Sequence, residues 1–404
     1  MQWTQNSLPL VSIIMPTYNR PEMLAEAIQS VLTQTYSNYE IIVINDSGVD
    51  VENVVSSLNK KENILYIKHK DNKGLAAARN TGIKNAKGKY IAYLDDDDIF
   101  YANHLATLVK HLETNNCDAA YTDAYKAKQV WHNNKYIILE KSLSYSYDFD
   151  YDRVLVENFI PILCVMHRKE CINKVGMFDE NLLRVEDWDL WIRMSRVYKF
   201  SHIREITCEF SWRDDGTSMM TGEQIPFDWA FLNMFHKYTN FVEGKSKIIR
   251  IHNDILAKAM GRLEEAAKKS LDSDEENSYK IFCIGQIEKT ISTFHFLKEK
   301  YPDNTLAINR IIDLLENRKT KFHQIKQESH AAGIPLISTQ NEWGEKVQQP
   351  DNEYIGNLQK KIVNLQKRTL DLEKKLKDLH ESRGWKLLTK YYELRDSLFP
   401  KSHK

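Results

Sequence analysis

Short β-rich runs alternate with amphipathic helical patterns over residues 8–125, and this alternation constrains the fold more than any other feature of the chain. The β-rich runs are Val11–Met15, Glu40–Ile44, Ile64–Lys68 and Tyr90–Leu94. Helical patterns begin at Pro21, Leu75 and Ala102, and proline is a normal residue in a first helical turn. Strands and helices that alternate at this spacing predict an α/β fold, with a mainly parallel sheet and helices on both faces.

Polar clusters follow three of the predicted strands, at Thr17–Arg20, at Asp46 and at Asp95–Asp98. Ligands of open α/β sheets bind beyond the carboxyl ends of the strands. The sequence therefore predicts one ligand site built from these three clusters.

The run Asp95–Asp98 is the most specific of the clusters. Four adjacent carboxylates repel one another, and we expect that they do not stay buried without a cation. Oxygen ligands at a strand end suit Mg²⁺ or Mn²⁺, and in an extended segment Asp95 and Asp97 point to the same side. The alternative is a solvated acidic loop, or an N-cap for the helix near Ala102.

Residues 8–220 resemble the family-two inverting glycosyltransferases, which have the GT-A fold, a Rossmann-like α/β architecture. The resemblance rests on ordered motifs at family-like spacing. They are Val11–Arg20, Ile42–Asp46, Gly74–Asn80, Leu94–Asp98, Val175–Glu180 and Val185–Trp191. A glycosyltransferase of this kind moves a sugar from a nucleotide donor to a hydroxyl group.

The resemblance implies a set of donor-binding residues. Thr17 and Tyr18 match the loop along the nucleotide base, and Asp46 matches the carboxylate that accepts a hydrogen bond from uracil. Lys73 and Arg79 fall near the nucleotide. The turn Asn45–Gly48 departs from the usual Asp-Asp-Gly-Ser, so Asp46 as a plain turn residue and Arg79 as a surface charge remain alternatives.

The resemblance also implies a metal site in the D-x-D motif. Asp97 is expected to contact Mn²⁺ or Mg²⁺, and Asp95 to contact both ribose and metal, while Asp96 fills the variable donor-side position. Asp215 falls where many members carry a histidine near the metal. Such an ion stabilises charge on the departing nucleoside diphosphate.

Glu186 and Asp187 match the family's catalytic pair, with Asp187 as the general base for the acceptor hydroxyl. Direct displacement by that hydroxyl predicts inversion at the anomeric carbon. The alternative is a pair of carboxylates that interact with a helix dipole. Trp188 and Trp191 are candidates for stacking on the acceptor sugar, and packing in the core is the alternative for both.

The chain divides into four predicted segments: a GT-A domain (1–244), a helical region (245–330), a linker (331–352), and a coiled coil with an amphipathic C-terminal helix (353–404). Heptad spacing from Ile355 to Leu379 predicts a homo-oligomer, and a solvated or membrane-lying helix is the alternative. Residues 351–404 hold 13 Lys and Arg against 8 Asp and Glu, although the whole chain is neutral. This basic tail predicts peripheral contact with an anionic membrane.

Composition excludes several other classes. A net charge of zero argues against a nucleic-acid binder. Five cysteines without a C-x-x-C pair argue against a disulfide framework and favour a reducing, cytoplasmic location. We find no signal peptide, no apolar run of the ~20 residues that span a bilayer, no P-loop and no G-x-G-x-x-G.

The sequence therefore predicts a bacterial, metal-dependent inverting transferase that uses a UDP-sugar. N-acetylglucosamine is the leading guess for the sugar, and dTDP-sugars are the second. The predicted acceptor is a surface glycan, including lipid-linked forms, or a protein Ser/Thr hydroxyl of the flagellin type. Two alternatives stay open: a non-catalytic coiled-coil scaffold with a degenerate transferase domain, and a sugar nucleotidyltransferase, which would normally have a glycine- and arginine-rich loop after the first strand.

Overall fold

The computed structural model describes most of the first 272 residues and part of the segment that follows. The described positions are 8–58, 63–132, 135–182, 184–215, 217, 224–272, 291, 294–295, 297–299, 301–305, 308–313 and 316. They belong to one compact unit, which extends to Ile325. The predicted linker and the predicted coiled coil lie outside the described residues, and so does the basic tail.

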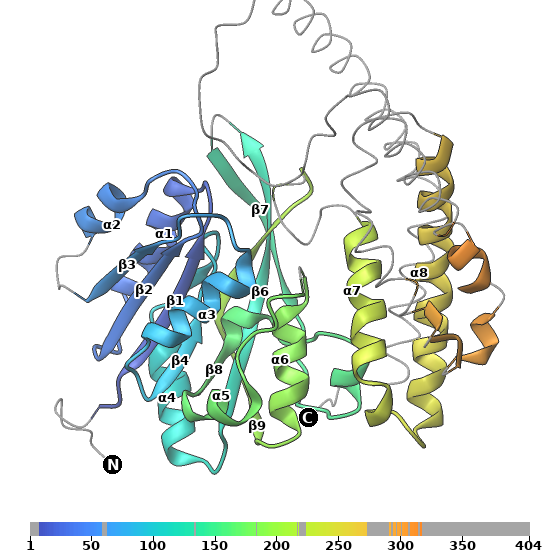
Figure 1. The fold of residues 1–404 in the computed structure, drawn as a ribbon. Coiled ribbons are helices and arrows are strands. Elements are labelled where there is room, and N and C mark those ends of the chain that lie inside the picture. Colours follow the sequence, from blue (N-terminus) through green and yellow to red (C-terminus); the bar gives the residue numbers. More distant parts are fainter. Residues whose placement is uncertain are drawn as a thin grey trace, which may run out of the picture. The chain divides into compact units, whose positions relative to one another are not determined.

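The first half of the sheet is parallel, as the alternation of strands and helices predicts (Figure 1). Its four strands lie in the order β3 (Ile64–Lys68), β2 (Tyr39–Asn45), β1 (Val11–Thr17) and β4 (Tyr90–Tyr93). All seven residues of β1 and all four of β4 are buried, which is typical of parallel strands that are covered on both faces.

Three helices connect these strands: α1 (Pro21–Leu32), α2 (Glu52–Leu58) and α3 (Leu75–Asn85). Helix α3 packs closely on β1 and β2 at Gly82. A Cβ atom on Gly82 would lie 2.5 Å from a side-chain carbon of Ile14 and 3.0 Å from one of Ile44. This helix can approach the sheet so closely because glycine has no side chain.

The second half of the sheet is mixed, which corrects the prediction of a mainly parallel sheet. Its five strands are β5 (Ile99–Phe100), β6 (Ala119–His132), β7 (Lys135–Ser144), β8 (Val165–Arg168) and β9 (Phe200–Arg213). Strands β6 and β9 are parallel, but β8 is antiparallel to both β4 and β6. The pairs β6–β7 and β5–β9 are also antiparallel. For β6 and β7 the physical reason is that only two residues separate them along the chain, and so short a connection places consecutive strands antiparallel.

The remaining helices cover this half of the sheet or extend from it (Figure 1). They are α4 (His104–Thr114), α5 (Glu170–Val175), α6 (Glu186–Ser195), α7 (Gln224–Lys237) and α8 (Ser246–Asp272). Four short 3-10 helices complete the described elements: η2 (Arg153–Leu155), η3 (Ile162–Cys164), η5 (Thr239–Phe241) and η7 (Pro302–Asn304).

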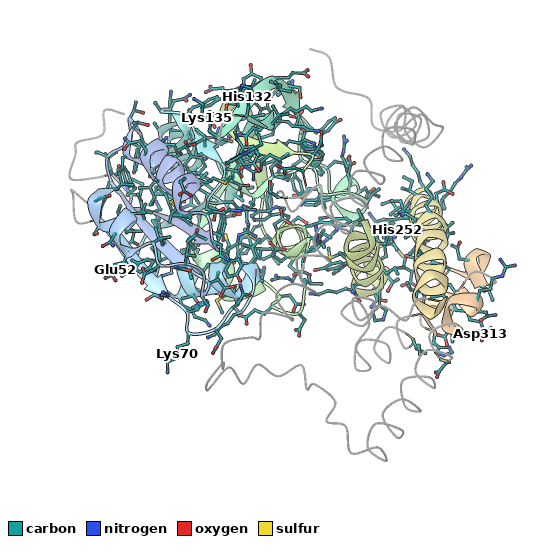
Figure 2. All side chains as sticks on the ribbon, turned by 90° about the horizontal axis from the view of Figure 1, so that it is seen from above. Glu52, Lys70, His132, Lys135, His252 and Asp313 are labelled. Atoms are coloured by element: carbon teal, nitrogen blue, oxygen red, sulfur yellow. The ribbon has the colours of Figure 1, made fainter. Side chains whose placement is uncertain are left out.

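His252 of α8 connects the helical region to the α/β domain. Figure 2 shows it on the helix pair α7–α8, far from His132 and Lys135 at the tip of the β6–β7 hairpin. Its Nε2 atom donates a hydrogen bond to the carbonyl of Leu155 at 2.8 Å, and its ring stacks on Phe235 with the centroids 3.8 Å apart. A fully buried imidazole thus links η2, α7 and α8.

Candidate active site

The aspartate run lies where the sequence places it, at the carboxyl end of β4 and beside β1. The Leu94 amide donates to the Ile14 carbonyl at 3.0 Å, and the chain then turns, with the Asp98 amide donating to the Asp95 carbonyl at 3.2 Å. Asp96 and Asp98 are buried, whereas Asp95 and Asp97 are partly exposed. The run therefore presents two of its four carboxylates toward solvent.

Backbone and hydroxyl groups hold the two buried carboxylates. The Thr17 hydroxyl donates to Oδ2 of Asp96 at 2.8 Å, and the Ser211 amide donates to Oδ1 of Asp98 at 3.0 Å. Burial and the neighbouring Asp97 raise the pKa of Asp96 to about 6, although Arg20 opposes the shift. Burial, with Asp97 nearby, also raises the pKa of Asp98 well above its usual range.

Two arginines bind Asp97 from different parts of the chain. Nη1 of Arg20 lies 3.1 Å from Oδ2 of Asp97 and 3.1 Å from Oδ1 of Asp96. Arg213, at the end of β9, also binds Oδ2 of Asp97. Arg213 is buried, so its guanidinium group is placed by the fold itself.

A third arginine, Arg79 of α3, joins the aspartate run to the start of α6. Its Nη2 atom lies 2.7 and 2.9 Å from the two carboxylate oxygens of Asp95, and its Nη1 atom donates to Oε1 of Glu186. Arg79 is 2% exposed, so the interpretation as a surface charge is wrong. Burial raises the pKa of Glu186 to about 7, although Arg79 opposes that shift.

The expectation that the aspartate run needs positive charge nearby is met in part by arginine side chains. The residues that supply the positive charge are Arg20, Arg79 and Arg213. Guanidinium groups bind carboxylates in planar, often bidentate geometry and stay charged at all ordinary pH values. The protein thus offsets part of the run's negative charge with its own side chains.

The catalytic pair predicted from the sequence lies at the first turn of α6. Val185 precedes it with φ 59° and ψ 23°, a left-handed conformation that is a genuine outlier for a β-branched residue. The Asp187 carboxylate accepts hydrogen bonds from the Trp188 amide at 2.7 Å and from Nδ2 of Asn158 at 3.0 Å. Burial raises the pKa of Asp187, which suits a general base.

Asp46 is the anchor of the turn before α3. It accepts hydrogen bonds from the amides of Lys73 at 2.9 Å and Gly74 at 2.7 Å, and it lies 2.7 Å from Nδ1 of His69. Gly74 has φ 89°, which favours glycine at this turn. The predicted contact of Asp46 with uracil stays a prediction, and Lys73 contributes its backbone amide here.

The two residues of the loop that is predicted to bind the base, Thr17 and Tyr18, differ in exposure. Thr17 is buried and holds Asp96, while the ring of Tyr18 is 49% exposed. The ring is therefore free to contact a ligand, as the sequence predicts, and that contact stays a prediction.

Asp215 is exposed and follows Arg213 by two residues. It accepts hydrogen bonds from the Tyr136 hydroxyl at 2.7 Å and from the Thr217 hydroxyl at 2.6 Å. Although burial raises the pKa of Asp215, these hydrogen bonds lower it overall. Within the described ranges no bond joins Asp215 to Asp95 or Asp97, and its metal role stays a prediction.

The donor set at the end of β4 fits a hard divalent cation. Asp95 and Asp97 are the exposed carboxylates, and both arginines on Asp97 bind its Oδ2 atom, which leaves Oδ1 unbonded among the described residues. Oxygen donors of this kind suit Mg²⁺ and Mn²⁺. In the described part of the chain, no three His, Cys, Asp or Glu side chains converge on one metal position, so other ligands would have to come from a substrate or from water.

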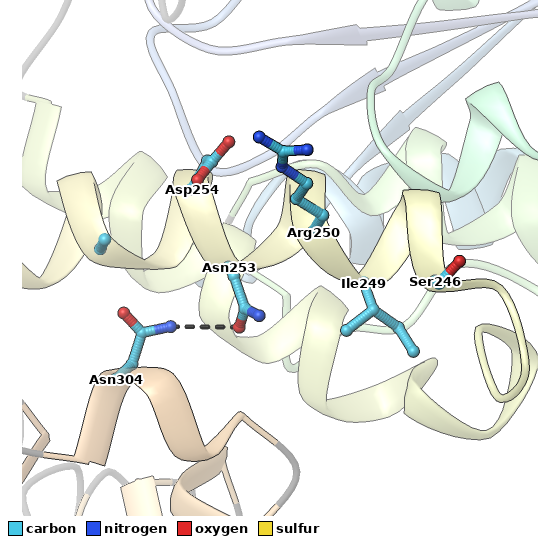
Figure 3. A pocket seen from close by; sticks show the side chains of 7 residues that line it. Ser246, Ile249, Arg250, Asn253, Asp254 and Asn304 are labelled. Carbon is cyan, nitrogen blue, oxygen red and sulfur yellow. Dashed lines mark hydrogen bonds between the residues drawn. The ribbon is translucent and has the colours of Figure 1, made fainter.

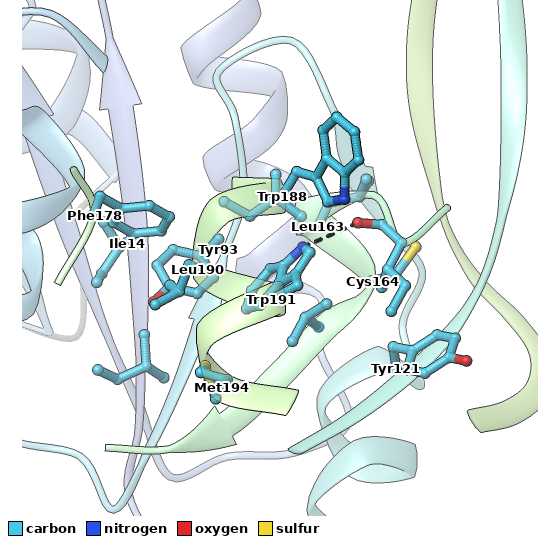
Figure 4. Packing of buried hydrophobic residues seen from close by; sticks show 14 of the residues in the cluster. Ile14, Tyr93, Tyr121, Leu163, Cys164, Phe178, Trp188, Leu190, Trp191 and Met194 are labelled. Carbon is cyan, nitrogen blue, oxygen red and sulfur yellow. Dashed lines mark hydrogen bonds between the residues drawn. The ribbon is translucent and has the colours of Figure 1, made fainter. Parts of the chain in front are cut away.

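The two tryptophans of α6 lie in the core (Figure 4). Trp188 is 1% exposed and Trp191 is fully buried. Their indole N–H groups donate to the carbonyls of Val154 at 2.5 Å and Ile160 at 3.2 Å. The structure therefore favours the packing interpretation over acceptor stacking, because neither ring presents a face to solvent.

Sequence reasoning assigned no role to four residues that shape the site: Arg20, His69, Asn158 and Arg213. Arg20 and Arg213 belong to motifs that the resemblance includes or borders, and their positive charge next to an acidic run is a signal that could have been used. No signal in the sequence singles out His69 or Asn158, because each is brought to the site by tertiary packing alone.

A separate pocket of about 530 Å³ lies along α8, and its lining includes Arg250, Asn253 and Asn304 (Figure 3). It contains none of the predicted site residues. The candidate active site lies instead at the carboxyl ends of the strands and at the start of α6, where the buried charges and the left-handed Val185 gather.

Comparison with known proteins agrees with this geometry. Residues 12–172 match the model of glycosyl transferase family 2. The chain is 34% identical over 244 residues to the putative colanic acid biosynthesis glycosyl transferase WcaA of Escherichia coli, covering 59% of this chain and 85% of WcaA. It is 31% identical to the uncharacterized glycosyltransferase YwdF of Bacillus subtilis, covering 51% of this chain and 75% of YwdF. The chain belongs to glycosyl transferase family 2.

Other relatives of this family-2 chain are longer. This chain is 38% identical over 185 residues to an uncharacterized glycosyltransferase of Rickettsia felis. The matched region covers 46% of this chain but only 30% of the relative. The chain thus matches less than a third of that protein.

Solved structures show the same fold. S. aureus TarS 1–349 in complex with UDP-GlcNAc has a TM-score of 0.51 and 16% identity, with 84% of this chain and 99% of that chain covered. The GT-A-like α/β fold is therefore confirmed. The described helices include none that is long and apolar enough to cross a membrane.

Proposed function

We propose that this family-2 chain transfers a sugar from a UDP-sugar to a hydroxyl group, with inversion at the anomeric carbon. One observation carries the proposal: Arg79 binds both Asp95 and Glu186. That contact holds the predicted donor end of the site next to the predicted base, Asp187. A nucleotide sugar on one side and an acceptor on the other would meet between them.

Asp187 is the proposed general base. Its two oxygens each accept one protein hydrogen bond, so each keeps a lone pair for another donor. The acceptor hydroxyl gives its proton to Asp187 as its oxygen forms a bond to the anomeric carbon. The bond from that carbon to the diphosphate breaks in the same displacement, and UDP leaves with the electron pair.

The diphosphate would lie against Asp95 and Asp97. Mn²⁺ or Mg²⁺ held there would neutralise the negative charge that grows on the leaving UDP. Arg20 and Arg213 already border these carboxylates, and they add positive charge on the same side. Tyr18 is exposed beside them and would lie along the base.

N-acetylglucosamine is the sugar we test first. The TarS structure in complex with UDP-GlcNAc supports this choice through the shared fold. A surface glycan or a protein Ser/Thr hydroxyl is the proposed acceptor. The relationship to WcaA, a putative colanic acid biosynthesis enzyme, supports the glycan.

The test is a screen of UDP-, dTDP- and GDP-sugars for release of the nucleotide, with Mn²⁺ and with EDTA. We expect turnover of a UDP-sugar that requires the metal, a loss of at least about 100-fold in Asp187→Asn, and a comparable loss in Asp97→Ala. Asp50→Asn is the matched control, because Asp50 is exposed and pairs with Lys68 away from the run.

Three outcomes would contradict parts of the proposal. Turnover of a dTDP- or GDP-sugar alone would overturn the donor assignment. Full activity in Asp187→Asn would overturn the base. A protein that neither turns over nor binds any nucleotide sugar with metal would fit the non-catalytic scaffold.

A further inference from the structure

Asn158 is an amide whose hydrogen bond goes to the proposed base. Its Nδ2 atom donates to Oδ2 of Asp187 at 3.0 Å, and its carbonyl Oδ1 is buried without a partner among the described residues. A carboxylate accepts but cannot donate when ionised, so the amide must turn its NH₂ group toward Asp187.

The segment that carries Asn158 is fixed to α6 on both sides. The Trp188 indole donates to the Val154 carbonyl at 2.5 Å, and the Trp191 indole donates to the Ile160 carbonyl at 3.2 Å. Both tryptophans follow Asp187 on the same helix. The segment is thus attached to the helix of the base at points before and after Asn158, which sets the amide against the carboxylate.

We propose that Asn158 is a positioning residue for Asp187, holding the carboxylate in its ionised form and directing its free lone pairs toward the acceptor hydroxyl. The inference deepens the proposed function and rests on it. A carboxylate that accepts a fixed hydrogen bond stays ionised to lower pH, and its rotation is restricted because the opposite oxygen is held by the Trp188 amide.

The charges around Asp187 set the direction of the expected effect. Arg79 on α3 favours its ionised form, while Asp95 after β4 and the adjacent Glu186 disfavour it. The Asn158 hydrogen bond acts in the same direction as Arg79. Removing it raises the pKa of Asp187, so the acid limb of the pH–rate profile moves to higher pH.

The first experiment measures release of UDP from UDP-N-acetylglucosamine with Mn²⁺, using the full chain. We expect Asn158→Ala to lower kcat by about 10-fold or more, with little change in the KM for the donor and with the acid limb shifted upward. Trp191→Phe keeps an aromatic ring, although a smaller one, and loses the hydrogen bond to Ile160, and we expect a smaller shift in the same direction. Unchanged kcat and an unchanged profile in Asn158→Ala would overturn the inference.

A matched control separates positioning from general destabilisation. Asn38 is also half-buried, and its Nδ2 atom donates to the Leu8 carbonyl at 2.6 Å, far from the base in the chain. Asn38→Ala should leave the pH profile of UDP release in place. A shift as large as that of Asn158→Ala would assign the effect to loss of stability and overturn the inference.

A second experiment needs no turnover. A double-mutant cycle of Asn158→Ala and Asp187→Asn measures their coupling from urea unfolding at several pH values. At neutral pH we expect the change in unfolding constant in the double variant to differ by about 10-fold from the product of the changes in the two single variants. This coupling should shrink in acid, as Asp187 takes up a proton. A coupling that does not change with pH would overturn the inference, even if no donor turns over. A pH-dependent coupling in a protein that turns over no donor would count against the proposed function alone.

Discussion

Arg79 binds Asp95 through one nitrogen, which lies 2.7 and 2.9 Å from the two carboxylate oxygens. The two residues come from different elements, the first turns of α3 and the end of β4. Because Arg79 also binds Glu186, one buried guanidinium group connects the two acidic motifs of the site.

We predict that Arg79→Gln destabilises the fold strongly. Removing one partner of a buried ion pair costs about 3–5 kcal/mol, because the other charge stays buried without compensation. Glu186 is the partner concerned, since it is buried while Asp95 is partly exposed. Urea unfolding checks the value. The control is Lys89→Gln, whose pair with Glu113 is exposed on the lysine side and should cost at most about 1 kcal/mol.

Two glycine substitutions should change stability in opposite directions. Gly74 has φ 89°, and a Cβ there would meet no atom within 4 Å, so Gly74→Ala tests the backbone alone. We expect a loss of about 1–3 kcal/mol and weaker UDP binding, because the Gly74 amide binds Asp46. Gly261→Ala, in α8 and equally open, should gain about 0.5–1 kcal/mol. Similar effects at both sites would contradict this conformational argument.

The buried His167 predicts a loss of stability in acid. It lies 2.8 Å from the Tyr93 hydroxyl, and burial lowers its pKa to about 4. Near pH 5, His167 is therefore neutral in the native state and protonated in the unfolded chain. Its contribution to the free energy of unfolding is present above about pH 6.5 and is lost as pH falls toward about 4. The loss amounts to about 3 kcal/mol.

Other groups act in the opposite direction, so a difference measurement is needed. Asp96 and Glu186 have native pKa values raised to about 6 and 7. Their contributions to the free energy of unfolding therefore become smaller as pH rises. Comparing the unfolding free energies of the wild type and His167→Gln between about pH 4 and pH 7.5 isolates the histidine. The difference in unfolding free energy between the wild type and His167→Gln should become smaller in acid. A difference that stays constant with pH would show that His167 does not titrate as described.

The predicted coiled coil of residues 353–404 is tested by the mass of the full-length chain. Its heptad pattern predicts self-association. Light scattering should give a multiple of the 47.4 kDa chain mass. A monomer at all accessible concentrations would contradict the oligomer and favour a single amphipathic helix instead.

The sequence predicts the first half of the fold well, because its signals are local. The β-rich runs and the Pro21 helix start lie within a residue or two of β1, β2, β3, β4 and α1. The second half was less predictable. Strands β6 and β9 both mix polar and charged residues with apolar ones, so their alternation is weak, and their pairing connects residues about 80 positions apart.

The sequence named the acidic residues that gather at the candidate site, together with Arg79, but it assigned no role to Arg20 or Arg213. Motifs identify Asp95, Asp97 and Asp187 because the residues stand together in short, recognisable runs. Arg213 reaches Asp97 across 116 positions, and Asn158 reaches Asp187 across 29. Such contacts depend on how strands and loops pack, which no local pattern encodes.

The arginines around the aspartate run have a consequence for how the protein would handle metal. Because three arginines already bind the run, we expect the chain to fold without an ion and to keep its native state when it is purified in a chelator. An ion at Asp95 and Asp97 would then bind together with each donor molecule and dissociate together with each UDP. Metal supply would set the rate of the reaction and leave the lifetime of the protein unchanged.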